Sequence, residues 1–354
     1  MRVPVALLAV AAIAAGGCGV SGSTGIDGPV TVYVSLPLTG SRADDGQDAA
    51  DGARLALEAA GGRAGSIAVL AKFLDDAGGK PWDPLAVGSN ARTAVQDSSA
   101  AAYIGELDSE PTRASVPITN DAGLLQVSPG AGAVDLTGPA IGYPDSPDRY
   151  RPSGSPSFAR TVPADDVQAA AAADWASELG VKRVTVVSDG TPFQELMNQE
   201  FTDAAEERGV EVAHPTPAKG TTTGSHPSGS IYDIENQSLR LDGGSAELRT
   251  TALLDPSRLP DPSFVRGFHD RFGRNPGPYA AYGYEAMELV LQTIAGAGDD
   301  ASQFRDNITE SVFGTDRTDS VLGDYSIDSD GDTTGCMIQR YRGGEPLGAA
   351  CPPS

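Results

Sequence analysis

Residues Tyr103 to Arg113 read YIGELDSEPTR, and this stretch decides the fold. The small and apolar residues from Ala100 to Ile104 are typical of a buried strand, which stops at Gly105. Two glutamates, an aspartate, a serine, a threonine and a proline follow it. Because proline is tolerated in the first turn of a helix, the pattern predicts a helix that opens near Glu110-Pro111, with Ser109 as its cap.

The same alternation extends in both directions along the chain. Strands are expected at residues 29–37, 67–74, 100–105, 124–127 and 183–188, another begins at 210–213, and two more flank the turn DSDGD within 325–341. Helices are expected at residues 48–60, 86–96, 112–122, 165–179, 194–208, 262–272, 279–295 and 303–312. Strands that alternate with helices predict an α/β fold, with parallel sheets flanked by helices.

The length of 354 residues and one break in the pattern predict two lobes. Residues 138–156 are rich in Pro, Gly and Ser and are the best candidate for a crossing between the lobes. We expect lobe I to comprise residues 30–155 and 279–322, and lobe II residues 156–278 and 323–354. Residues 214–244 are low in complexity at their start and are expected to be irregular, so lobe II is predicted to be reduced.

Charge and missing motifs exclude several classes of function. The chain has 48 acidic and 25 basic residues, a formal net charge of −23, which disfavours nucleic acid as a partner. It has no GxSxG, HExxH or Walker motif, and its three histidines (His214, His226 and His269) lie in polar contexts. The segment DSDGDTT has the aspartate spacing of a calcium loop, but Thr333 and Gln339 stand at two required positions, so a polar hairpin turn is expected. We expect no enzyme activity, no cofactor and no metal.

The N-terminus predicts export. The apolar run from Val3 to Ala15 has the length of a signal-peptide core and is short for a membrane span. It leads to AGGC, which resembles the bacterial lipoprotein signal, in which the cysteine, here Cys18, is lipidated; the alternative is an ordinary secretory signal with an incidental cysteine. We expect residues 1–18 to be a signal peptide, 19–29 a flexible tether, and the protein to be anchored by lipid on the extracytoplasmic face of the cell membrane.

Two further cysteines suit an oxidising compartment. Cys336 and Cys351 flank a strand-like run and the turn Gly343-Gly344, and a hairpin there would bring their sulfurs together. We expect a disulfide between them; the alternative is two buried free thiols.

The ends of the predicted strands are the candidate binding site, because loops and helix N-termini meet at the carboxyl edge of a parallel sheet. After the first of these strands, backbone N–H groups beside Ser109 are suited to a carboxylate, and Asp108 or Glu110 to an ammonium group. The next strand ends in SPGAG, residues 128–132, where small side chains let a ligand approach the backbone. The alternative is a self-contained cap, in which Ser109 bonds its own helix and both acids face water.

Four stretches in order resemble the type I periplasmic binding proteins of the leucine/isoleucine/valine-binding group, the solute receptors of branched-chain amino-acid ABC importers. They are VYVSLPLTGSRADDGQDAADGARLAL (32–57), YIGELDSEPTRASVPITNDAGLLQVSPGAG (103–132), RVTVVSDGTPFQELMNQEF (183–201) and PGPYAAYGYEAMELVLQTI (276–294). The resemblance covers most of residues 30 to 345. It implies a two-lobed fold, a small amino-acid-like ligand, an ABC transporter permease as partner, and a monomer.

The resemblance also implies roles for single residues. Ser109 stands where the family binds the carboxylate with a hydroxyl, Ala131 where backbone groups also hold it, and Asp45 where an aromatic residue commonly lies at the mouth of the cleft. Phe193 matches the aromatic residue of the second-lobe turn. Tyr282 is a candidate whose spacing is equally explained by core packing. The full expected ligand set is Asp45, Asp108, Ser109, Glu110, Ser128, Ala131, Gly132, Phe193 and Tyr282.

Two departures from the family pattern concern the ligand. Gly132 replaces the threonine that usually ends the SPGAG-type turn, and lobe II lacks a clear counterpart of the acidic residue that takes the amino group; Asp233 and Glu235 are possible substitutes. We therefore expect a solute-binding lipoprotein for an amino acid or a related amine or amide. The alternative is a degenerate member that acts as a sensor or interaction lipoprotein without binding amino acids.

Replacing the predicted lipidation site gives the first test. We expect Cys18→Ala to release the exported protein from membranes, because acyl chains on this residue would supply the attachment. Membrane fractionation measures it, with Ser21→Ala in the tether as the matched control. A Cys18→Ala protein that still sediments entirely with membranes would show that the anchor lies elsewhere.

Overall fold

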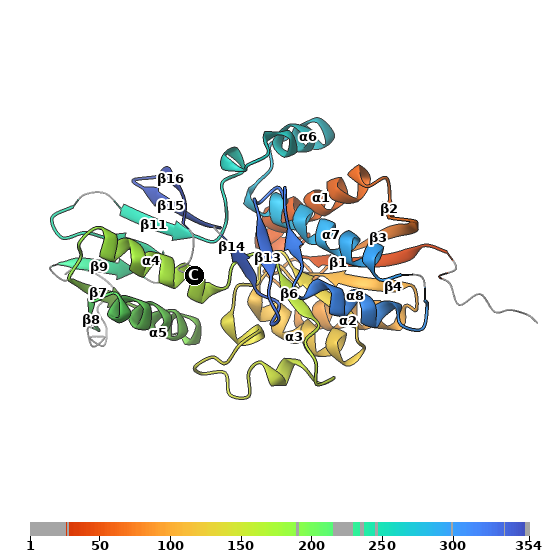
Figure 1. The fold of residues 1–354 in the computed structure, drawn as a ribbon, viewed down its shortest axis with the longest axis horizontal. Helices are drawn as coiled ribbons and strands as arrows, with labels where there is room; N and C mark the ends of the chain where they lie inside the picture. Colours follow the sequence, from red (N-terminus) through yellow and green to blue (C-terminus); the bar gives the residue numbers. More distant parts are fainter. Residues whose placement is uncertain are drawn as a thin grey trace, which may run out of the picture.

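The computed structural model describes residues 26, 28–188, 191–214, 229–233, 237–244, 247–298, 300–335 and 337–350. Its elements form two lobes that lie end to end, each built on its own large sheet (Figure 1). Among the described residues, no helix is both long enough and apolar enough to span a membrane. The predicted α/β architecture of parallel sheets flanked by helices is confirmed.

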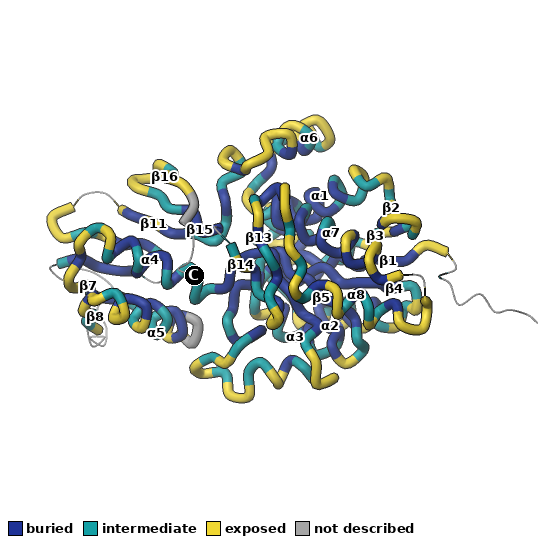
Figure 2. The backbone as a smooth tube through the Cα atoms, viewed as in Figure 1, coloured by how far each residue is buried: buried dark blue, intermediate teal, exposed yellow. Residues whose placement is uncertain are grey.

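The sheet of lobe I has the strand order β2-β3-β1-β4-β5-β6. Its strands are β1 (Val30–Leu36), β2 (Arg63–Ala64), β3 (Ile67–Asp75), β4 (Ala100–Ile104), β5 (Leu125–Ser128) and β6 (Phe158–Arg160). All neighbours are parallel except β2 and β3. Every residue of β1 and β4 is buried, because helices cover both faces of the sheet (Figure 2).

The apolar residues of β1 and β4 divide between two cores. One face packs against α1 (Ala43–Ala59), α7 (Pro278–Gly296) and α8 (Phe304–Val312), and the other against α2 (Pro84–Gln96) and α3 (Ser109–Asp121). Helices α1 and α7 touch backbone to backbone: a methyl group at Gly52 would overlap the carbonyl of Ala280, and one at Gly283 would overlap that of Ala49. Glycine at these two positions therefore allows the close contact.

The sheet of lobe II has the order β16-β15-β11-β10-β9-β7-β8. Its strands are β7 (Arg183–Val187), β8 (Glu211–Ala213), β9 (Ser230–Asp233), β10 (Ser238–Arg240), β11 (Glu247–Thr251), β15 (Ile338–Arg342) and β16 (Glu345–Ala350). Strand β7 is parallel to β8 and β9, and the other neighbours are antiparallel. Helices α4 (Asp165–Glu178) and α5 (Pro192–Glu207) pack on it.

Lobe II is reduced at the position that the sequence suggested. In the described residues between β9 and β11, the short strand β10 stands where a helical crossover would join parallel neighbours. The expectation that residues 214–244 are irregular is wrong for β9 and β10. Tyr232 and Leu239 are buried in the core of lobe II, and this tertiary packing orders the two strands.

The chain crosses between the lobes at points that differ from the expected boundaries. Strand β6 pairs with β5, so the first crossing follows Arg160 and not residue 155. Helix α6 (Pro262–Phe272), expected in lobe II, contacts α1 and buries Phe264 and Phe268 in the core of lobe I. The chain returns to lobe II after a small sheet of β12 (Asp316–Arg317), β13 (Tyr325–Ile327) and β14 (Thr333–Gly335).

The expected polar hairpin turn between β13 and β14 is confirmed. The carboxylate oxygen Oδ1 of Asp328 accepts hydrogen bonds from the backbone N–H groups of Asp330, Gly331 and Asp332 at 2.9–3.0 Å. The turn is therefore closed by its own side chain.

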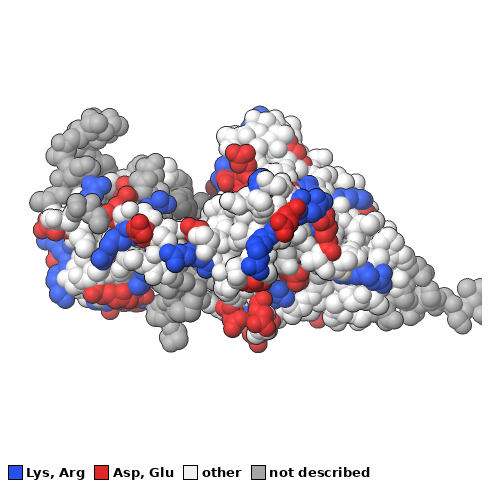
Figure 3. All heavy atoms as spheres, turned by 90° about the horizontal axis from the view of Figure 1, so that it is seen from above, with Lys and Arg blue, Asp and Glu red and all other residues white. Residues whose placement is uncertain are grey.

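Charged side chains of both signs are interspersed over the described part of the surface that Figure 3 displays. That face presents no extended basic patch among the described residues.

Candidate functional site

Two loops at the carboxyl ends of β4 and β5 are joined into one unit. The hydroxyl of Ser109 accepts a hydrogen bond from the backbone N–H of Ala133 at 3.1 Å. The hydroxyl of Ser128 donates to the carbonyl of Glu106 at 2.6 Å and accepts from the N–H of Ala131 at 2.9 Å. Each serine therefore ties one loop to the other.

These bonds correct the prediction for Ser109. Helix α3 begins at Ser109, its N-cap residue is Asp108, and no side-chain cap hydrogen bond forms. Both the predicted cap and the alternative of a self-contained cap are wrong, because the hydroxyl is engaged by the neighbouring loop. The N–H groups of Gly130 and Ala131, expected to be free for a carboxylate, are bonded to Ser128.

The acidic residues expected to meet an ammonium group are paired with arginines. The guanidinium of Arg42 lies 2.8 Å from the carboxylate of Asp45 and 3.0 Å from that of Asp108, and it donates to the hydroxyl of Tyr279 at 3.3 Å. Burial nevertheless raises the pKa of Asp108 above its usual value. Glu110 is exposed and pairs with Arg113 at 2.6 Å. These acids are therefore largely neutralised.

A cavity of about 190 Å³ lies between the lobes at these strand ends. Lobe I contributes Gly130, Gly132 and Tyr279 to its lining. The crossings and lobe II contribute Val162, Pro163, Asp165, Gln168, Thr251, Ala252 and Leu253. Of the residues expected to bind a ligand, Gly132 lines this cavity.

The contact between Gly132 and Asp165 closes one side of the cavity. The backbone N–H of Asp165 donates to the carbonyl of Gly132 at 2.8 Å, and a methyl group at Gly132 would overlap the carboxylate oxygen Oδ1. Within the described part of the chain, the Asp165 carboxylate has no hydrogen-bond or ion-pair partner. Burial raises its pKa to about 6. A carboxylate from the start of lobe II thus stands beside the position where the family resemblance implies a threonine.

The second crossing is held by two side chains. The amide of Gln168 donates to the carbonyl of Thr250 at 3.0 Å and accepts from the N–H of Ala252 at 3.1 Å. The hydroxyl of the fully buried Tyr282 donates to the carbonyl of Ala252 at 2.7 Å and accepts from the N–H of Leu254 at 3.0 Å. Tyr282 therefore anchors the crossing, whereas Tyr279, one helical turn earlier, lines the cavity.

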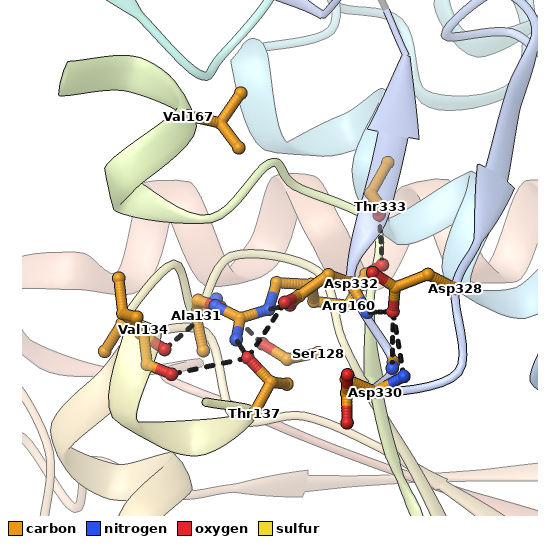
Figure 4. Close-up of polar contacts among 12 residues, drawn as sticks. Ser128, Ala131, Val134, Thr137, Arg160, Val167, Asp328, Asp330, Asp332 and Thr333 are labelled. Carbon is orange, nitrogen blue, oxygen red and sulfur yellow. Dashed lines mark hydrogen bonds and ion pairs between the residues drawn. The ribbon is translucent and has the colours of Figure 1, made fainter. Parts of the chain in front are cut away.

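Arg160, at the first crossing, is fully buried and holds the loop after β5 (Figure 4). It donates to the carbonyls of Ala131 and Ala133 at 3.0 Å each and to the hydroxyl of Thr137 at 2.6 Å. Its Nε atom lies 2.8 Å from the carboxylate of Asp332, which belongs to the turn before β14. One side chain thus connects the cavity turn with both segments that leave lobe I.

Several predicted residues lie outside the described residues or side chains. Phe193 lies in the first turn of α5, but its side chain is not described. Cys18, Glu235, Cys336 and Cys351 are outside the described residues, so lipidation and the disulfide stay predictions. Asp233 ends β9. In the described part of the chain, no group of acidic, histidine or cysteine side chains is arranged to hold a metal ion.

The sequence analysis missed Arg42, Asp165, Gln168, Tyr279 and Arg160. One sequence feature could have indicated Asp165, because this residue begins the first helix after the Pro/Gly-rich segment. Gly132 carried another, because a glycine in place of a larger residue marks a close approach by a neighbour.

A pair of buried carboxyl groups lies beneath the two loops. Asp76 and Glu106 are 1% and 0% exposed, and Tyr103 donates to Oε1 of Glu106 at 2.6 Å. Both carboxylate oxygens of Asp76 and Oε2 of Glu106 have no hydrogen-bond partner among the described residues. Burial, together with the neighbouring negative charge, raises the pKa of Asp76 to about 6 and that of Glu106 well above its usual value. Two such groups cannot both ionise at low cost, so the pair retains a proton.

This pair predicts how stability depends on pH. The unfolded carboxyl groups lose their protons near pH 4 and the folded ones only above about pH 6, so the stability present at pH 4 to 5 is lost as pH rises. We expect the free energy of unfolding, measured with urea, to fall by roughly 1 to 3 kcal/mol between pH 5 and pH 8 in the wild type. Glu106→Gln, which keeps the shape and supplies an N–H donor, should flatten this dependence. An unchanged slope in Glu106→Gln would contradict the shared proton.

The fit of Gly132 against Asp165 predicts energetic coupling. Gly132 lies outside the left-handed backbone region, and the added methyl group of Gly132→Ala would overlap the end of the Asp165 side chain, which can rotate aside, so this variant should lose about 1 kcal/mol or less. In an Asp165→Ala background most of that loss should disappear. Urea unfolding of the four proteins measures the coupling, and equal losses in both backgrounds would show that the two residues do not press on each other.

Comparison with known proteins agrees with this architecture. The sequence profile of one family, described as periplasmic binding protein, matches residues 29–229. No curated protein sequence matches the chain.

The fold is shared with solved structures at low sequence identity. The leucine-binding protein LivK from Thermotoga maritima is 21% identical with a TM-score of 0.69, and the comparison covers 91% of this chain and 99% of that one. LivJ from Streptococcus pneumoniae in complex with isoleucine is 19% identical with a TM-score of 0.65, covering 91% and 99%. An ABC-transporter solute-binding protein from R. palustris in complex with benzoate is 18% identical with a TM-score of 0.66, covering 92% and 97%.

These structures share the two-lobed fold with this chain, and the family profile extends from the first strand of lobe I past β8 of lobe II and ends just before β9. Since that match covers more than half of the sequence, the chain belongs to the periplasmic binding protein family.

Proposed function

We propose that this protein is the extracytoplasmic receptor of an ABC importer of the branched-chain amino-acid type. It captures a small polar ligand, an amino acid or a related amine or amide, between its two lobes. The observation that supports this is the cavity at the carboxyl ends of the lobe I strands, which is lined by Gly132 and Tyr279 from one lobe and by Asp165 and Gln168 from the other.

Capture of this kind requires binding and no chemical step. A ligand that touches both lobes stabilises the closed arrangement by its greater affinity for that arrangement than for an open one. The chain passes between the lobes after β6, β11 and β14, so relative rotation is confined to these segments. The anchoring of the first two crossings by Arg160 and Tyr282 limits where they bend.

The structural neighbours support a small ligand. The ligands bound in two of them, isoleucine and benzoate, are compact molecules with an apolar body and one polar end. The cavity of about 190 Å³ lies below the usual range for drug-sized ligands, roughly 300 to 1,000 Å³.

The receptor is proposed to act as a monomer attached to the membrane through Cys18, with a transporter permease as its partner. The AGGC site behind a short apolar segment supports the anchor. The tether of residues 19–29 would let the lobes reach the permease.

A rival function is a sensor or interaction lipoprotein that binds no solute. It is favoured by one observation: β10 pairs antiparallel with both β9 and β11, in the place where a helical crossover would join parallel strands, so lobe II is reduced there. The two functions differ in whether a small solute stabilises the protein.

Thermal unfolding against a panel of amino acids, amines, amides and benzoates tests the receptor function. A ligand at about 100 times its dissociation constant should stabilise the fold by about 2.7 kcal/mol and raise the melting temperature by several degrees. Unrelated sugars serve as the control for nonspecific stabilisation. If no compound of the panel raises the melting temperature, the solute-free rival stands.

A further inference from the structure

We propose that the cleft selects a small organic cation, an amine with no carboxylate beside it, and that Asp165 binds its ammonium group. This inference rests on the proposed function and names the ligand class of the same cavity. It departs from what the family resemblance implies, because the turn that would hold a carboxylate faces a carboxylate here.

The first argument is the position of Asp165. Its carboxylate lines the cavity, contacts the backbone of Gly132, and has no donor or cation as partner within the described part of the chain. Asp165 is half-buried, and a carboxylate in such a place is stabilised by a positive group that joins it. A ligand ammonium group beside Gly132 would supply that group.

The positively charged side chains near Asp165 are already paired with other carboxylates. The charged groups that act on Asp165 are Arg160, Arg113, Asp166 and Asp135. Arg160 is paired with Asp332 at 2.8 Å, and Arg113 with Asp135 at 2.6 Å.

Arg42 is the basic residue that contacts Tyr279 of the cavity, and it is divided between Asp45 and Asp108. A ligand carboxylate would therefore meet arginines that are already neutralised. An ammonium group would meet the carboxylate of Asp165, which has no partner among the described residues.

The third argument concerns the backbone donors. The N–H groups of Gly130 and Ala131 donate to Ser128, and that of Ala133 donates to Ser109. Three of the donors that would cradle an anion at this turn are thus already bonded within the protein. Displacing either hydroxyl to seat a carboxylate would leave a buried polar group without its partner, at a cost in affinity.

The apolar side chains of the lining determine which uncharged part of a ligand fits the cavity. Val162, Leu253 and the ring of Tyr279 lie around the cavity, and its volume of about 190 Å³ suits a short alkyl or cyclic body. The ligand class is therefore a compact primary amine with an apolar substituent.

Three probes of one shape test the charge preference. The compounds 3-methylbutylamine, leucine and 3-methylbutanoate share a branched apolar body and differ in their charged groups. Titration calorimetry of the wild-type protein at pH 8 should show binding of the amine, at least tenfold weaker binding of leucine, and no binding of the acid. Leucine or 3-methylbutanoate binding as tightly as the amine overturns the inference.

A matched pair of variants tests the role of Asp165. Asp165→Asn removes the charge from the cavity lining, and Asp166→Asn removes a charge from the same helical turn outside that lining. We expect 3-methylbutylamine to bind about 10- to 100-fold more weakly to Asp165→Asn and with wild-type affinity to Asp166→Asn. Equal weakening by both, or by neither, would rule out Asp165 as the ammonium partner.

The outcomes separate this inference from the proposed function. If leucine, another amino acid or benzoate binds and the amine does not, the receptor function stands and the cation preference is wrong. If no solute binds, both fail.

Discussion

The buried guanidinium of Arg160 is the interaction on which the rest of the site depends. A cation that is 0% exposed must be matched by charge and acceptors, and here Asp332, two carbonyl groups and a threonine hydroxyl supply them. These partners come from the turn after β5, from Thr137 and from the loop before β14. The chain passes from lobe I to lobe II twice, once after β6 and once after β14. The guanidinium therefore fixes the turn beside the cavity relative to both of these segments. If the turn moved alone, the buried charge would lose its acceptors.

Once the turn is fixed, one close contact determines the charge that the cleft presents to a ligand. Gly132 leaves room for the carboxylate of Asp165, which arrives with the first turn of α4 immediately after the crossing. Ser128 and Ser109 accept hydrogen bonds from the N–H groups of Gly130, Ala131 and Ala133, and nearby arginines pair with Asp108 and Asp135. A fold shared with solved structures of receptors for leucine, isoleucine and benzoate thus presents, at this edge of the sheet, a carboxylate that has no partner among the described residues.

The local sequence pattern predicted the architecture because, in lobe I, the pattern of each segment agrees with the helix or strand that the segment forms. The alternation of β1, the all-apolar β4 and the long stripe of α7 each indicate their structure without reference to distant residues. The failures arise where tertiary contacts decide. Strand β6 has three residues and is ordered by pairing with β5, and β10 by pairing on both sides. Ser109 has the sequence signature of a cap, yet Ala133 takes its hydroxyl. Asp165 contacts Gly132 although the two residues are 33 positions apart in the sequence, so a local sequence pattern could not predict this contact.

The central claim is that Arg160 holds the cavity turn to the crossing segments. Comparing amide hydrogen exchange in Arg160→Lys and in the wild type tests it most directly. Lysine keeps a positive charge beside Asp332, but it lacks the planar, forked donors with which arginine reaches two carbonyl groups and Thr137 at once. The account predicts faster exchange at residues 128–137 with protection in β1 and β4 unchanged. Unaltered exchange at residues 128–137, or an equal acceleration throughout lobe I, would contradict it.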